Sequence, residues 1–293
     1  MSSADALRLL FLSAVWGASF LFMRVAAPEF GYFPLVLCRI GGAALVLLPV
    51  LVPKKNRQIL HKLWFPFLIL GLFNSALPFS LFSFAALNLE AGFSSLLNAT
   101  TPIATAIVGF LWLRVPLKPL QLIGLAVGFA GIAILVSDRW SFETGGSGWS
   151  VLAILGATTS YGVAAHFAKR HLADAPSLVV TSGSLLFAAL LLVPFALTNL
   201  PDKTPSANAV TSAAGLALLC TALAYVMFFD LLKRTTATAA ATVTYIVPVF
   251  GILWGVLFLD ESITSRIVLG MLVALAGTAL VTGISRKRQR DRQ

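Results

Sequence analysis

The sequence predicts an all-α membrane protein whose ten transmembrane helices form two inverted five-helix repeats. Three observations support this fold class: the composition is too apolar for a soluble domain, ten apolar runs reach spanning length, and the two halves resemble each other. Of the 293 residues, 58% are hydrophobic and only 11% are charged, and the mean hydropathy is +0.92. Soluble domains carry about 25% charged residues, so an ordinary water-soluble core is excluded.

Ten apolar runs are the predicted membrane spans, because a helix needs about 20 apolar residues to cross the hydrocarbon core of a bilayer. The first run is longer than the apolar core of a signal peptide, and we expect the protein to retain it. Charged or turn-forming residues separate the runs, and the connecting loops are too short for a soluble domain. The predicted spans are residues 6–27, 34–52, 63–87, 92–113, 118–137, 148–168, 178–199, 208–232, 237–259 and 264–284.

Lysine and arginine residues predict the orientation of these spans. Of the 21, 16 lie on one side of the predicted membrane and four on the other, while Arg39 lies within a span. Positively charged loops stay in the cytoplasm, so we expect both termini there and place the protein in the bacterial inner membrane. The basic tail from Arg286 to Arg292 is expected to contact the headgroups of the lipid bilayer, and nucleic acid is not an expected partner.

The two halves of the chain align at a nearly constant offset. The segment Ala43–Pro49 resembles Ala188–Pro194 at an offset of 145, which places the repeats at residues 1–140 and 141–293. Each repeat holds five spans, an odd number, so the second must cross the membrane in the opposite sense. Secondary transporters with such inverted repeats bind substrate between their halves. Further pairs at an offset of 146 are Pro102 and Pro248, Gly109 and Gly255, Arg114 and Asp260, Gly124 and Gly270, and Gly131 and Gly277.

Short motifs in the two halves carry a family resemblance. Trp16-Gly17-Ala18-Ser19-Phe20 lies in the first span, Arg39 lies early in the second, and Leu259-Asp260-Glu261 leads from the ninth span into the last. With these motifs the chain resembles the EamA-type branch of the drug/metabolite transporter superfamily, and within it the YddG-type amino-acid exporters. The resemblance implies a substrate cavity formed by spans one, three, four, six, eight and nine. The first repeat departs from the family at Val115, which stands in place of an end-of-helix glutamate.

Polar and aromatic side chains in those spans are the candidate substrate-binding residues. Asn98 is the strongest, because a buried amide needs hydrogen-bond partners; the alternative is a hydrogen bond between helices. Pro102 and Pro248 each remove a backbone hydrogen bond at equivalent places, which favours either a binding site or a packing kink. Aromatic walls suit a partly apolar solute, although core packing also explains any single ring. The candidates are Trp16, Phe20, Asn74, Pro78, Phe82, Asn98, Thr101, Tyr161, Tyr225, Thr242 and Tyr245.

Arg39 and two glycine-rich helix faces have structural interpretations. We expect Arg39 to anchor loop carbonyls or a carboxylate such as Glu29, and the alternative is a site for a substrate carboxylate. The small residues of Gly124–Gly128 and Gly270–Ala274 let helix backbones approach closely. We expect these faces to pack the two peripheral helices together, with dimerisation as the alternative, and a monomer is favoured.

The expected function is a secondary transporter that exports amino acids, including aromatic ones, by alternating access. No Asp or Glu lies near the middle of a predicted span, and His166 lies near a span end, so we expect uncoupled, facilitated transport. The alternatives are an exporter of other small metabolites or drugs, with proton coupling, and a channel, which the repeat disfavours. The three histidines are dispersed and no ATP-binding motif is present. We therefore expect no enzyme activity, no metal and no cofactor.

Overall fold

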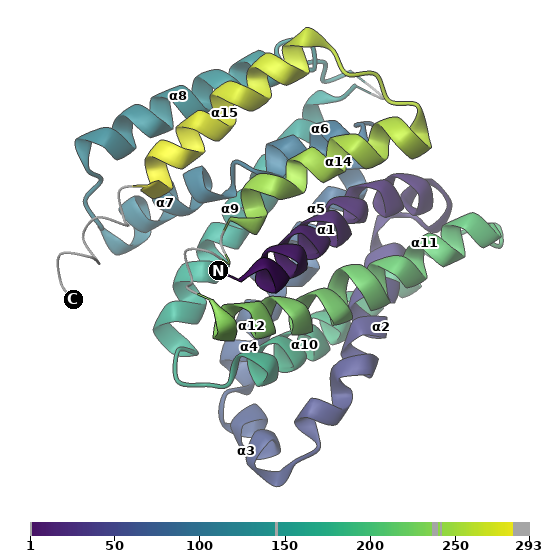
Figure 1. Ribbon diagram of the computed structural model, residues 1–293. Helices are drawn as coiled ribbons and strands as arrows, with labels where there is room; N and C mark the ends of the chain where they lie inside the picture. The colour runs from purple at the N-terminus through teal and green to yellow at the C-terminus, as the bar shows by residue number, and fades with distance from the viewer. Residues whose placement is uncertain (1, 144–145, 236–239, 241, 284–293) are drawn as a thin grey trace.

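The fold is that of a computed structural model, in which residues 2–143, 146–235, 240 and 242–283 are described. This part of the chain contains helices and no strands, as the sequence predicted (Figure 1). Nine of its helical segments are long and apolar enough to cross a membrane, and a tenth apolar helix has 17 residues. The basic tail from Arg286 to Arg292 and part of the predicted span at 237–259 lie outside the described residues.

The first half of the chain begins with a helix that Ser2 caps through its hydroxyl, which accepts from the amide of Asp5. Gly31, at φ 72°, makes the turn into the next helix. The elements are α1 (Ser3–Phe30), α2 (Tyr32–Leu47), η1 (Leu48–Leu51), α3 (Lys54–Lys62), α4 (Trp64–Gly71), η2 (Leu72–Ala76), α5 (Leu77–Ala85), α6 (Ala91–Asn98), α7 (Thr101–Leu113) and α8 (Pro119–Val136).

The second half repeats much of this order. One element, α11, is capped by the hydroxyl of Ser206, which accepts from the amide of Ala209. The elements are α9 (Gly148–His171), α10 (Ser177–Leu197), α11 (Ala207–Ala217), η3 (Leu218–Leu223), α12 (Ala224–Arg234), α14 (Val243–Leu259) and α15 (Ser265–Gly283).

Two local features of the helices differ from the sequence prediction. A loop was expected around Pro53 to Arg57, but α3 is a short helix with no buried residue at one end of the bundle (Figure 1). Its charged residues face water, and Ile59 and Leu60 on the other side of the helix are half-buried against the core. The expected third and eighth spans each contain a wide π-helical turn, η2 and η3, at equivalent places in the two halves.

The paired prolines behave differently from each other. The helix is interrupted before Pro102, between Asn98 and Thr101, and the Thr101 hydroxyl donates to the Asn98 carbonyl over 2.7 Å. By contrast, α14 runs without interruption through Pro248. The helix of the second half is therefore not interrupted at Pro248 itself; Thr242 lies in a turn just before α14, and residues 236–239 and 241 lie outside the described residues. Pro102 lies in the first turn of α7, where its missing amide ends one helix and begins another.

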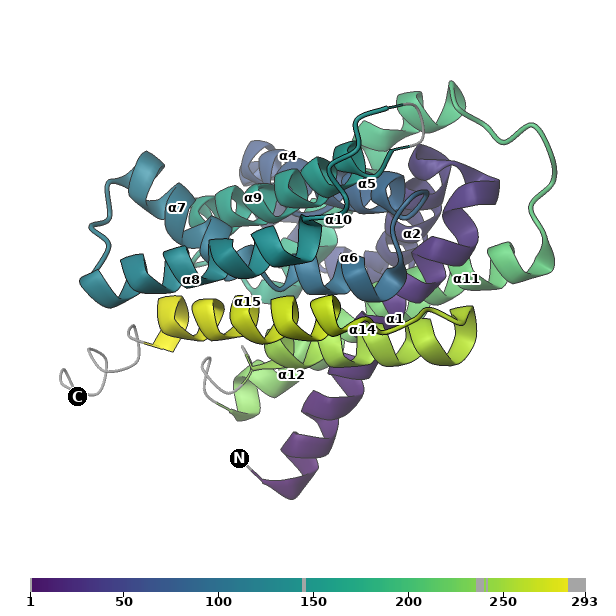
Figure 2. The ribbon, with the colours of Figure 1, turned by 90° about the horizontal axis from the view of Figure 1, so that it is seen from above.

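Helices α8 and α15 pack side by side along one flank of the bundle (Figures 1 and 2). A Cβ added to Gly131 would lie 2.4 Å from the amide nitrogen of Ala274, and one added to Gly277 would lie 2.3 Å from that of Gly128. Contacting residues therefore run in opposite directions, so the two helices are antiparallel. The glycine faces pack the peripheral helices together, as the sequence predicted.

A second pair of close contacts joins the two halves. A Cβ on Gly17 of α1 would lie 2.9 Å from the amide nitrogen of Gly251 in α14. A Cβ on Gly162 of α9 would lie 3.0 Å from the Cα of Thr105 in α7. Gly162 and Gly17 differ by 145 in number, and Gly251 and Thr105 by 146. The same helix crossing therefore occurs twice, with the halves exchanged.

The antiparallel glycine packing gives a stability prediction. Gly277→Ala should lower the free energy of unfolding by about 1–3 kcal/mol, because a methyl group there overlaps the backbone of α8. Gly41→Ala is the matched control, since its new methyl would meet only a Leu37 side-chain carbon at 3.9 Å. Thermal unfolding in detergent should show a lower midpoint for Gly277→Ala alone; equal midpoints for both variants would contradict the packing.

Candidate functional site

A cavity of about 1150 Å³ lies between the two halves of the chain. Its walls come from α1, α2, α5, α6, α7, α9, α12, α14 and α15, together with η2, η3, the loop at 115–117 and the start of α8. Ten of the eleven candidate residues line it, and Pro78 does not; it is buried in the first turn of α5. The residues brought together are Trp16, Phe20, Asn74, Phe82, Asn98, Thr101, Tyr161, Tyr225, Thr242 and Tyr245.

Aromatic rings cover two sides of the cavity. On one side Phe82 packs edge-on against Phe20, with centroids 5.7 Å apart, and stacks on Tyr161 at 6.2 Å. On the other side Trp16 lies 6.4 Å from Tyr225 and 5.4 Å from Phe228. These surfaces provide an apolar and polarisable lining of the kind that binds aromatic or aliphatic side chains.

Hydrogen-bonding groups are concentrated where α6 ends and α7 begins. Asn98 and Thr101 line the cavity at the interrupted helix. The Thr101 hydroxyl occupies the Asn98 carbonyl, while its distance to Asn98 Oδ1 is 3.4 Å. One turn further on, the Thr105 hydroxyl donates to the carbonyl of Thr101 over 2.8 Å. These hydroxyls therefore satisfy the local backbone, and Asn98 lines the cavity beside them.

Arg39 lines the cavity, and its hydrogen-bond partner differs from the one expected. Its Nε donates to Thr221 Oγ1 over 3.0 Å, and its Cζ lies 3.8 Å from the Phe79 ring centroid. The expected partner, Glu29, instead accepts from the amide and hydroxyl of Ser206 at 2.6 and 2.7 Å. The expectation of a Glu29 pair or a loop-carbonyl anchor is therefore wrong. In the bundle interior, the hydroxyl of Thr221 in η3 accepts a hydrogen bond from Arg39.

Several lining residues were not among the candidates. Phe79 lies three residues before Phe82, and Phe228 lies three residues after Tyr225. Helical spacing from those candidates could therefore have found both. Gln121 and Thr282 belong to spans five and ten, which the family resemblance had left out of the cavity. Among the further lining residues are Ser19, Met23, Thr105, His166, Cys220 and Thr244.

His166 has a structural partner in the wall. Its Nε2 lies 3.0 Å from the carbonyl oxygen of Thr105, and a carbonyl accepts, so the ring nitrogen donates. A Cβ on Gly109 would lie 2.8 Å from this nitrogen, so the glycine makes room for the ring. Nearby, the hydroxyls of Tyr245 and Thr282 are hydrogen-bonded to each other. The His166 ring thus ties α9 to α7.

The cavity extends toward the end of the bundle that carries Arg114 and Lys118, called here the Lys118 end. The exposed residues Val115 and Pro116 and the half-buried Gln121 line it there. The opposite end carries Glu261 and is called the Glu261 end. None of the polar network that closes that end is among the cavity-lining residues.

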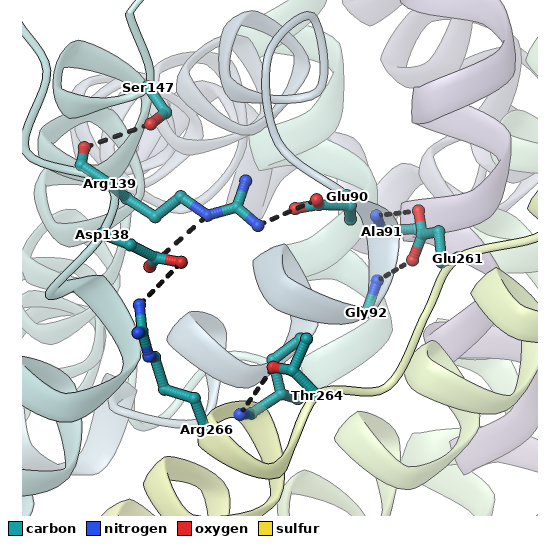
Figure 3. A network of polar contacts seen from close by, with 10 residues as sticks. Glu90, Ala91, Gly92, Asp138, Arg139, Ser147, Glu261, Thr264 and Arg266 are labelled. Atoms are coloured by element: carbon teal, nitrogen blue, oxygen red, sulfur yellow. Dashed lines mark hydrogen bonds and ion pairs between the residues drawn. The ribbon is translucent and has the colours of Figure 1, made fainter.

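A carboxylate holds the two halves together at the Glu261 end (Figure 3). The Glu261 carboxylate accepts from the amide of Ala91 over 2.6 Å and from that of Gly92 over 2.9 Å, at the first turn of α6. Such charge-assisted bonds to a helix N-terminus are favoured by the helix dipole. This contact requires a glycine at position 255, because a Cβ there would lie 2.2 Å from Glu261 Oε2.

Ion pairs extend this network across the same end (Figure 3). Arg139 lies 2.9 Å from Glu90 and 3.7 Å from Asp138, and Arg266 of the second half lies 2.7 Å from Asp138. The Arg266 and Asp138 side chains are 45% and 51% exposed, and exposed pairs contribute about 0.2–1 kcal/mol. Bonds to a charged group contribute about 1.5–3 kcal/mol each, so Glu261 dominates the closure.

Comparisons with known proteins agree with this architecture. The profile of the EamA-like transporter family matches residues 6–137 and again 148–283. An uncharacterized transporter of Bacillus subtilis, YvbV, is 26% identical over 97% of this chain and 93% of its own length. A protein of Escherichia coli named a probable amino-acid metabolite efflux pump is 25% identical, with 94% of each chain covered.

The fold itself has a counterpart among solved structures. One crystal structure superposes with a TM-score of 0.64 over 98% of this chain and 99% of its own, at 19% sequence identity. The apolar helices and the family matches make this an integral membrane protein. Because the family profile matches both halves and most of the sequence, the chain belongs to the EamA-like transporter family.

Proposed function

We propose that the protein is a secondary transporter that exports amino acids across the inner membrane by alternating access. The observation that carries this proposal is a cavity between the two halves that extends to one end and is closed at the other. Aromatic walls beside amide and hydroxyl groups suit a solute with an apolar side chain and a polar head. The E. coli relative named an amino-acid metabolite efflux pump supports the substrate class.

The proposed architecture is ten spans in two inverted repeats, residues 1–140 and 141–293, of the YddG type. The recurrence of one helix crossing with the halves exchanged supports it, as does the antiparallel packing of α8 and α15. The ends of α7 and α14 also match. Arg114 and Asp260, 146 apart, both adopt the left-handed conformation, at φ 52° and 53°. Such a two-fold relation lets one half rock against the other around a fixed site.

An asymmetry between the two ends favours the conformation in which the Glu261 end is closed. The residue after the left-handed cap is Glu261 at one end and Val115 at the other, and each donates its amide to the carbonyl of Gly255 or Gly109 over 3.2 Å. Only the glutamate has a carboxylate that reaches the first turn of a helix from the other half. The Glu261 end therefore closes more tightly, and this clamp must break when the cavity opens there.

The proposed transport is uncoupled and driven by the solute's own gradient. No Asp or Glu is among the described residues that line the cavity, and a proton-coupled carrier needs a titrating group that both sides reach in turn. His166 is the alternative coupling residue, because it lines the cavity and an imidazole can carry a proton. Export of other small metabolites with proton coupling is the second candidate function that this histidine would favour.

Sidedness is tested by single cysteines at opposite ends. Lys55→Cys and Lys203→Cys replace two exposed lysines in a variant without Cys38, which is also exposed. A membrane-impermeant maleimide added to intact cells should label position 203 and not position 55. The reason is that position 55 lies in the basic loop with Lys54 and Arg57, which we propose to be cytoplasmic. Equal labelling of both positions from outside would contradict the inverted topology.

Transport is tested with labelled amino acids in proteoliposomes. Trp16→Ala and Asn98→Ala should each reduce the initial rate about tenfold, because they remove an aromatic wall or a hydrogen-bonding amide from the cavity. Trp140→Ala and Asn199→Ala are matched controls at exposed positions outside the cavity, and both should keep the normal rate. Normal rates in both cavity variants, with equal amounts of folded protein, would show that the site is misplaced.

The clamp is tested by a spin-label distance across the Glu261 end. Labels at the exposed positions 88 and 262 flank the contact between α6 and α14. Glu261→Gln should add a longer-distance population, because the neutral amide loses charge-assisted bonds worth about 1.5–3 kcal/mol each. Glu143→Gln, an exposed acidic residue at the same end, is the control. A distance distribution unchanged by Glu261→Gln would remove the clamp from the mechanism.

A further inference from the structure

Arg39 is an uncompensated charge within the membrane-spanning part of the protein. It is 5% exposed and lies within α2, which has spanning length together with η1. Of the described residues that line the cavity, Arg39 is the only lysine, arginine, aspartate or glutamate. None of the ion pairs in the described part of the chain includes it. Its charge therefore faces the cavity without an acidic partner.

The guanidinium keeps donors for a ligand. Its Nε donates to Thr221, and its Nη1 has only a weak acceptor, the Met23 sulfur at 3.6 Å. No hydrogen bond from Nη2 is found among the described residues. A planar guanidinium offers five N–H donors in a fork that matches a carboxylate. The edge that carries Nη1 and Nη2 is thus available for a bidentate contact.

Physical chemistry favours an anion beside such a group. A charge placed inside a membrane protein is costly unless it is paired or hydrogen-bonded. The Phe79 ring, 3.8 Å from Cζ, provides a cation–π contact, but it does not neutralise the charge. A single neutral hydroxyl, that of Thr221, also leaves it unneutralised. An anionic group of the solute would complete the environment whenever the cavity is occupied.

The surroundings define what kind of anion fits. Asn74 and Tyr225, whose side chains are 3.5 Å apart, line the same end of the cavity as neutral hydrogen-bonding groups. Beyond them the walls are the aromatic rings of Trp16, Phe82 and Tyr161. A solute with a carboxylate at one end and an apolar body at the other matches this gradient from charge to aromatic surface. Inorganic anions would leave the aromatic walls without a partner.

We propose that Arg39 binds the carboxylate of the transported solute and determines its specificity for carboxylic acids. The assignment deepens the proposed function and rests on it. It places the apolar body of the solute between the aromatic walls and the head of the solute at the junction of α2, η2 and η3. A bidentate contact fixes the orientation of the solute as well as its charge.

The test is ligand binding by the purified full-length protein, measured by calorimetry in detergent. The probes are phenylalanine, phenylalaninamide and phenylpropionate, which separate the carboxylate from the amino group. The unmodified protein should bind phenylalanine and phenylpropionate about tenfold or more tightly than phenylalaninamide. Arg39→Gln should abolish this preference, and Arg39→Lys should retain part of it, because a lysine keeps the charge without the fork.

Arg24→Gln is the matched control. Arg24 donates to the carbonyls of Ala86 and Leu87 at 2.6 and 2.9 Å and does not line the cavity, so this variant should keep the preference. If Arg39→Gln does not fold, Arg39→Lys decides the test through the same ratio. If the folded Arg39 variants keep the preference for phenylalanine over phenylalaninamide, the assignment of Arg39 is overturned, whereas the proposal of amino-acid binding is not. Binding of phenylpropionate alone refutes amino-acid export but supports Arg39, and binding of neither carboxylate overturns both.

Discussion

The contact between the Glu261 carboxylate and the first amides of α6 holds the two halves of the protein together at one end. It depends on backbone geometry at both partners: Asp260 turns the chain in a left-handed cap, and Gly255 leaves space for the carboxylate. Because Val115 replaces the glutamate in the first half, the other end lacks an equivalent contact at this position. One end is therefore closed by charge-assisted bonds, and the cavity extends toward the other.

Polar groups in the interior also need partners within the protein, because the surrounding lipid supplies no water to hydrogen-bond them. Thr101 satisfies the carbonyl freed by the interruption before Pro102, and His166 donates to a carbonyl of α7. Buried hydroxyls such as those of Ser75 and Ser94 have no hydrogen-bond partner in the described part of the chain. Arg39 differs from them in carrying a charge, and its neighbours are a hydroxyl, a thioether and an aromatic ring. Among the described residues that line the cavity, Arg39 is the only lysine, arginine, aspartate or glutamate.

Local sequence patterns predicted the long apolar helices because hydrophobicity is itself local. They placed ten of the eleven candidate residues around the cavity, since asparagine, threonine and tyrosine stand out within apolar helices. They failed where partners are distant in sequence: Thr221 lies 182 positions from Arg39, and no periodicity indicates that pair. Sequence analysis treated Glu261 only as a feature of the helix end. Its partners are backbone amides, which every residue except proline carries, so no residue type in the sequence indicates them. The continuous helix through Pro248 was also missed, since a proline predicts a lost hydrogen bond but not whether the helix breaks.

The central claim is that one cavity is exposed alternately to the two sides of the membrane. Counterflow measures this directly: proteoliposomes loaded with unlabelled amino acid are diluted into a trace of labelled amino acid, without a proton gradient or voltage. Alternating access predicts a transient, saturable accumulation of label above its outside concentration, driven by exit of the unlabelled solute. An ohmic current without any transient accumulation would show a continuous pore and contradict the account.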